Sequence, residues 1–198
     1  MIAKFYLFFI MLFIFAQNLL YSEIKLVKSD GYVQLKYNEK ADWITPKVGD
    51  SLKAGYIIYT GFKSSAMIQT NNSTIDVKPL TQLTIASLIE SVNKEDTDLY
   101  LKYGNIKANV NMNKEKQTLF KVRSANSTAS VRGTNFFFSN EILLVEEGTV
   151  ELLTSNGFSL LVQKNESAMI NKLDMPSTPF QNIIKDSSVN IMPVGFSG

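Results

Sequence analysis

Between Ile24 and Ile170 the chain is a succession of short apolar runs separated by turn-forming residues, with no convincing helical period. The segment Tyr32–Tyr37 alternates apolar and polar residues, which is typical of a strand with one buried face. Two further runs flank Asn71-Asn72-Ser73, and because asparagine tolerates positive φ this stretch predicts a hairpin turn. The pattern predicts an all-β fold of many short strands, arranged as a sandwich or as a stacked, solenoid-like roll.

The N-terminal segment is set apart from this pattern. Lys4 precedes an unbroken run of twelve apolar residues from Phe5 to Ala16, followed by a polar break at Gln17-Asn18. This run is shorter than the roughly 20 residues of a membrane span and predicts a secretory signal peptide over residues 1–22, cleaved after Ser22. An uncleaved N-terminal anchor is the competing interpretation, whereas a lipoprotein anchor is excluded because the chain has no cysteine.

The rest of the chain has the length of one domain. We expect a β domain over residues 23–171, with two halves that could meet at a polar, exposed loop over residues 93–98. Prolines at 176, 179 and 193 predict a partly ordered tail over residues 172–198, in which 180–185 forms a short helix or an added edge strand.

Composition excludes several classes of function. The chain contains neither histidine nor cysteine, so the commonest general base, the thiol nucleophile and the usual zinc ligands are all missing. Glu146 and Glu147 are adjacent on a predicted strand and therefore face opposite ways. We expect no enzyme activity, no catalytic residue, no cofactor and no metal site. A formal net charge of +2 gives no reason to expect nucleic acid as a partner.

The most distinctive segment runs from Ser130 to Phe138. Val131-Arg132-Gly133-Thr134 leads into the aromatic run Phe136-Phe137-Phe138, and Gly148 punctuates the strands that follow. Because both faces of the aromatic run are apolar, it predicts a strand buried between layers. The alternative is that one phenylalanine is exposed at a partner site.

The Val-Arg-Gly-Thr-x-Phe core and the turn residues around it resemble the signature of the FecR-domain family over residues 31–170. The positions that carry the family motif are Val131, Arg132, Gly133, Thr134, Phe136, Gly148, Gly49, Asp50, Gly55, Thr60 and Gly61. The resemblance implies a stand-alone, exported, non-enzymatic FecR domain in the periplasm or otherwise outside the cytoplasm. The cytoplasmic anti-sigma segment and mid-chain membrane helix of classical members have no counterpart in the sequence.

Two hypotheses about function follow from the resemblance. In the first, the protein is an interaction module in envelope signalling or sensing and captures an envelope protein through residues 93–98 or 111–117. In the second, it is a structural or glycan-binding envelope component without a signalling role. A membrane is a partner only if the N-terminal segment stays uncleaved. Four tyrosines could line a surface that stacks on sugars, although tyrosines fit half-buried strands equally well. They are Tyr56, Tyr59, Tyr100 and Tyr103.

Arg132 has two interpretations as well. Its guanidinium could hold an anionic group in a bidentate contact. We favour a structural role, in which its five donors satisfy carbonyl groups where one strand ends and the next begins. Gly133 would then supply a backbone conformation that a side chain forbids.

Overall fold

The computed structural model describes residues 24–91, 93–112, 115–170 and 180–181. Every regular element in this part of the chain is a β-strand, so the predicted all-β class is confirmed. The predicted signal peptide and most of the predicted tail lie outside the described residues. Phe180–Gln181 in the tail is a strand, and the described residues contain no helix that could cross a membrane.

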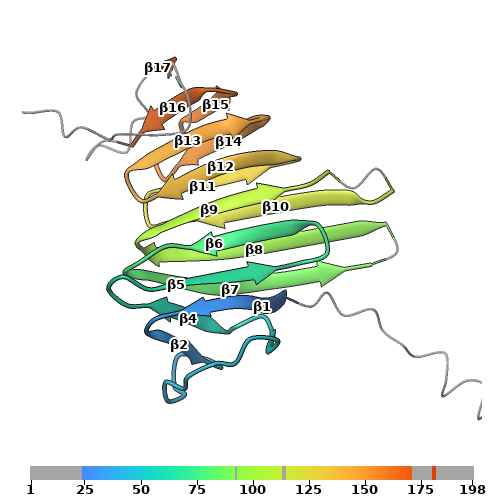
Figure 1. Ribbon diagram of the computed structural model, residues 1–198. Helices are drawn as coiled ribbons and strands as arrows, with labels where there is room; N and C mark the ends of the chain where they lie inside the picture. Colours follow the sequence, from blue (N-terminus) through green and yellow to red (C-terminus); the bar gives the residue numbers. More distant parts are fainter. Residues whose placement is uncertain (1–23, 92, 113–114, 171–179, 182–198) are drawn as a thin grey trace, which may run out of the picture.

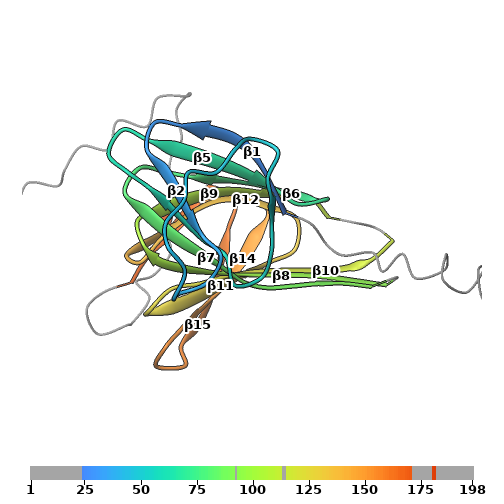
Figure 2. The ribbon, with the colours of Figure 1, turned by 90° about the horizontal axis from the view of Figure 1, so that it is seen from below.

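The strands form two large sheets, here called sheet A and sheet B. Sheet A contains, in spatial order, β17 (Phe180–Gln181), β16 (Glu166–Met169), β13 (Ile142–Glu147), β12 (Thr134–Ser139), β9 (Asn105–Val110), β6 (Ser73–Val77), β5 (Ser65–Gln69), β1 (Ile24–Asp30) and β3 (Ser51–Leu52). Sheet B contains, in spatial order, β15 (Ser159–Gln163), β14 (Thr149–Thr154), β11 (Ser127–Val131), β10 (Gln117–Arg123), β8 (Lys94–Tyr103), β7 (Thr81–Glu90), β4 (Ile57–Thr60) and β2 (Val33–Lys36). Seen along the stack, the two sheets face each other across the core (Figure 2).

The chain alternates between the two sheets as it passes from the β2 end of the stack to the β16 end (Figure 1). Hairpin β5–β6 lies in sheet A, β7–β8 in sheet B, β12–β13 in sheet A and β14–β15 in sheet B. The fold is therefore a two-sheet sandwich whose strands follow one another along an axis, which combines the two arrangements that the sequence left open. The predicted turn at Asn71-Asn72-Ser73 joins β5 to β6, as expected.

A shared apolar core runs the length of the stack, from Ile24 to Ile170. The strands supply alternate residues to it, which is the period-2 pattern of half-buried strands. Phe120 of sheet B meets Phe136 of sheet A across the core, with ring centroids 6.3 Å apart in an edge-to-face arrangement.

The aromatic run on β12 alternates instead of being buried on both faces. Phe136 and Phe138 are fully buried in the core, whereas Phe137 is only partly covered. The expectation of a strand buried between two layers was therefore wrong. Sheet A is an outer layer of a two-layer fold, so one face of β12 remains at the surface.

Residues 93–98 are not a loop, which corrects a second expectation. After a bend at Asn93, residues 94–98 open β8, a ten-residue strand that pairs with β7 on one side and runs parallel to β10 on the other. The inward-facing positions here are polar, because Glu95 and Thr97 are buried before the apolar Leu99 and Leu101. The side chains of residues 94–98 alternate between buried and exposed as in any strand, but their polar composition is typical of a loop.

Candidate functional site

The Val-Arg-Gly-Thr motif forms a corner where the chain crosses from sheet B to sheet A. Val131 ends β11, Arg132 and Gly133 make the turn, and Thr134 begins β12. Gly133 has φ = 72°, in the left-handed region that glycine adopts at little cost. The motif thus lies at a change of layer, at the rim of the sandwich.

Arg132 does not have the structural contacts favoured from the sequence. Its side chain is exposed, and within the described chain it makes no hydrogen bond and no ion pair. The reason is its place on the outside of the corner, from which the side chain projects to solvent and not toward the backbone carbonyls. The guanidinium is therefore open to an external partner.

Thr134 and Phe136 anchor the corner from the inside. The Thr134 side chain is buried, and its Oγ1 has no hydrogen-bond partner among the described residues. Phe136 fills the core beside it.

The remaining motif positions lie at turns elsewhere in the stack. Gly49 and Gly55 have φ values of 97° and 89°, and Asp50 accepts a hydrogen bond on Oδ2 from the backbone N–H of Lys47 at 2.8 Å. Thr60 is fully buried and ties two segments together, as its Oγ1 donates to the Lys78 carbonyl at 2.6 Å and accepts from the Thr81 N–H at 3.1 Å.

Gly61 and Gly148 complete the set of corners. The Gly61 N–H donates to the Tyr32 carbonyl at 2.8 Å, and Gly148 has φ = 83° between β13 and β14. The motif residues are thus spread over many turns of the stack and do not converge on one chemical centre.

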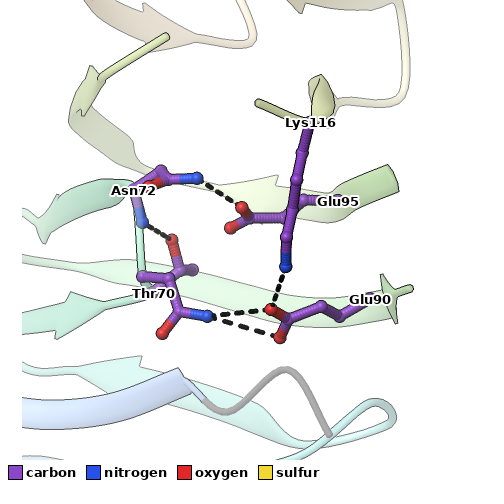
Figure 3. Close-up of polar contacts among 6 residues, drawn as sticks. Thr70, Asn72, Glu90, Glu95 and Lys116 are labelled. Atoms are coloured by element: carbon purple, nitrogen blue, oxygen red, sulfur yellow. Dashed lines mark hydrogen bonds and ion pairs between the residues drawn. The ribbon is translucent and has the colours of Figure 1, made fainter. Parts of the chain in front are cut away.

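A cluster of polar side chains does converge, at the tip of hairpin β7–β8 (Figure 3). The Glu90 carboxylate accepts hydrogen bonds from Asn71 Nδ2 at 3.2 and 3.3 Å and forms an ion pair with Lys116 Nζ at 2.8 Å. Asn72 Nδ2 donates to the Glu95 carboxylate. These five residues come from the β5–β6 turn, the β7–β8 hairpin and the segment before β10. We call them the tip cluster.

Burial sets the electrostatics of the tip cluster. Glu95 is 3% exposed, and loss of solvent raises the pKa of its carboxyl, helped by the nearby negative charge of Glu90. The hydrogen bond to Glu90 raises the pKa of Lys116. Both carboxylates already have partners, and no group of three metal-ligating side chains is found in the described residues. The cluster fastens three segments together and offers no obvious place for acid–base chemistry.

The structure brings together the two segments expected to contact a partner. The Gln117 N–H donates to the Asn93 carbonyl at 2.9 Å, and β8 and β10 continue side by side from that point. The β7–β8 tip and the end of β9 project from the same side of the stack (Figure 1).

The motif corner joins the same rim. The Asn111 N–H donates to the Asn72 carbonyl at 2.8 Å, next to the tip cluster. The following residue, Met112, packs so close to Gly133 that a Cβ on the glycine would lie 3.1 Å from the Met112 Cβ. We define the rim surface by its exposed residues: Ile89, Lys94, Asn111, Met112 and Arg132. Sequence reasoning named the two segments and Arg132 but missed Ile89, because only the folded structure places this end of β7 beside them.

Comparisons with known proteins agree with this architecture. A family model described as FecR protein matches residues 56–156, a shorter stretch than residues 31–170, over which the sequence resembles the family. Two crystal structures, at 2.50 and 1.65 Å resolution, of a protein from Parabacteroides distasonis described as a candidate anti-sigma factor have a similar fold. They match with TM-scores of 0.53 and 0.52 and are 16% and 15% identical over 64% of this chain. The match spans 59% of the length of those chains, and no curated protein matches the sequence.

Proposed function

The chain belongs to the FecR protein family, and we propose that it is an exported, non-enzymatic binding module that acts in envelope signalling or sensing. The shared fold with a candidate anti-sigma factor supports a regulatory setting. Because the match covers only part of that chain, the activity of the whole neighbour is not transferred. The absence of histidine and cysteine from the sequence supports a role through binding.

The observation that carries the proposal is the rim surface. It joins the motif corner, the start of β8 and the end of β9 on one side of the molecule. Met112 is 64% exposed and Ile89 is 48% exposed, so the surface includes two exposed apolar side chains. Arg132 adds an unpaired positive charge, whereas the charge of Lys94 is paired with Asp96 at 2.6 Å. Exposed apolar side chains rimmed by charge are typical of protein–protein contacts.

Site-specific crosslinking in the producing cells tests this proposal. A photoreactive residue at Met112 is expected to capture a defined protein, and Arg132→Glu is expected to reduce that capture because it reverses a charge on the rim. Leu161 is 59% exposed on β15 and serves as the matched control position. The proposal fails if Met112 and Leu161 give the same products, or if neither gives a product and the protein sediments with cell-wall polymer. The latter result would favour a structural or glycan-binding envelope component.

A further inference from the structure

A row of side chains crosses the outer face of sheet B at the end of the stack away from β15. Gln34 on β2 pairs with Tyr59 on β4, Tyr59 with Gln82 on β7, and Gln82 with Tyr103 on β8. Leu35, Ile58 and Leu83 next to them in sequence face the core, so the row faces outward. Adjacent strands lie about 4.8 Å apart, which gives the row a length of about 14 Å.

Tyr59 is the centre of an aromatic group on this row. The Tyr32 ring meets it edge-to-face at 6.3 Å, and the Trp43 ring lies 6.0 Å away at a tilt of 57°. Tyr32 is 61% exposed and Trp43 is 40% exposed, so both rings are open to a ligand. Exposed aromatic rings held against one another are unusual on a free surface and typical of binding sites.

The backbone holds these rings in place. A Cβ on Gly61 would lie 3.0 Å from Tyr32 Cδ1, so the glycine allows the ring to settle against the chain. The Tyr32 N–H donates to Ser64 Oγ at 2.8 Å.

The segment that carries Trp43 is fixed from the other side. Ile44 forms a bridge with Leu35, and Gln34 Nε2 donates to Thr45 Oγ1 at 3.0 Å. The surface is thus arranged before a ligand arrives, which lowers the entropy cost of binding.

Gln34 and Gln82 are 9% and 8% exposed, and Gln34 Nε2 already donates to the Val33 carbonyl and to Thr45 Oγ1, both at 3.0 Å. The unused hydrogen-bonding capacity of the row therefore lies at Gln82 and at the tyrosine hydroxyl groups. The Tyr103 hydroxyl donates to Gln82 Oε1 at 2.9 Å, which leaves the Gln82 amide nitrogen without a hydrogen-bond partner in the described chain. Burial raises the pKa of Tyr103, so this hydroxyl stays protonated at neutral pH. Lys36 makes a cation–π contact with one of the rings, with its Nζ 4.9 Å from the centre of the Trp43 ring.

We propose that this row, Gln34–Tyr59–Gln82–Tyr103 with Tyr32 and Trp43, binds a neutral oligosaccharide. The apolar face of a pyranose ring stacks on aromatic rings, while its hydroxyl groups take hydrogen bonds from amide and phenol groups. The row offers both kinds of contact and spans more than one sugar ring. An extended proline-rich peptide would use the rings, but its prolines have no N–H to donate, so the phenol oxygens of the row would receive fewer hydrogen bonds than from sugar hydroxyl groups. The proposal is independent of the rim surface, which lies on other residues.

Trp43 provides a direct readout, because it is the sole tryptophan of the chain. Its fluorescence is followed while the full chain is titrated with neutral hexasaccharides: N-acetylchitohexaose, cellohexaose and maltohexaose. At least one sugar is expected to change the emission saturably. Tyr59→Ala is expected to weaken that sugar roughly tenfold, the effect of losing one or two ring contacts.

Phe158→Ala is the matched control, because Phe158 is 48% exposed at the opposite end of the stack and should leave binding unchanged. Gln82→Ala gives a second test if Tyr59→Ala impairs folding, as judged by circular dichroism. The proposal is overturned if no sugar gives a saturable change, or if the folded variants bind as tightly as the wild type. It is equally overturned if a proline-rich peptide gives the response and the sugars do not.

Discussion

Gly148 stacks directly on Gly133, since a Cβ on Gly148 would lie 2.6 Å from the Gly133 carbonyl oxygen. These two glycines form successive corners, from β11 to β12 and from β13 to β14. The family motif and the glycine that follows it are therefore parts of one packed rim. The corner at Gly148 has no room for a side chain at this point of contact.

Gly148→Ala should destabilise the protein by about 2–5 kcal/mol, from left-handed backbone strain plus the clash with Gly133. Gly157 is the matched control. It also has a left-handed φ, of 85°, but has nothing within 4 Å of an added Cβ. Gly157→Ala should cost only the strain of about 1–2 kcal/mol. Chemical denaturation of both variants measures the difference, and equal losses would mean that the stacking of the corners is unimportant.

Thr134→Val should raise stability by about 1 kcal/mol, because it removes a buried hydroxyl that has no partner in the described chain. Thr60→Val should lower it by about 1–3 kcal/mol, because Lys78 and Thr81 lose their partner. Thermal melts compare the two substitutions. A loss of stability in both would show that the Thr134 hydroxyl is satisfied in solution.

Arg132→Ala should change the free energy of unfolding by less than about 0.5 kcal/mol, as expected for an exposed side chain without partners in the described chain. The same variant should reduce crosslinking from Met112. A clear drop in the melting temperature would restore the structural role first expected from the sequence.

Phe136→Ala should cost about 3–5 kcal/mol, because it empties a core position in edge-to-face contact with Phe120. Phe137→Ala should cost less than about 1 kcal/mol, since Phe137 lies on the partly covered outer face. Urea titration of both variants checks this. Similar losses would indicate that a further layer covers the outer face of β12.

Glu95→Gln tests the electrostatics of the tip cluster. Burial raises the pKa of Glu95 above the ordinary 4.5. At pH values between 4.5 and the raised pKa, the Glu95 carboxyl therefore binds more protons in the native state than in the unfolded state. Wild-type stability should therefore fall as the pH rises from about 4.5 through the raised pKa. Glu95→Gln lacks this loss and should melt higher than the wild type at pH 7, with the gap closing below pH 4.5. A gap that does not depend on pH would contradict the assignment.

The strands themselves could be predicted from the sequence where apolar and polar residues alternate clearly, as in β2 and β6. The start of β8 could not, because its buried positions are Glu95 and Thr97 and their burial depends on partners from other elements. Lys116 reaches Glu90 across 26 residues of sequence. No local pattern encodes such a contact.

The candidate sites, too, were only partly predictable from the sequence. Tyr59 and Tyr103 were named from the sequence as residues that could stack on sugars, but Tyr32 and Trp43 were not. Their position depends on how β2, β4 and the segment before β3 pair. For Arg132, the sequence locates the corner but does not say which way the side chain points, so its exposure could not be predicted.

The alternation of hairpins between the sheets also bears on how the chain folds. Strand β6 pairs with β9 only after the chain has passed through the whole β7–β8 hairpin in the opposite sheet. Hairpins form from neighbouring residues, whereas each junction between them closes a longer loop. We expect the native contacts to accumulate hairpin by hairpin along the stack, with junctions forming alternately in sheet A and sheet B.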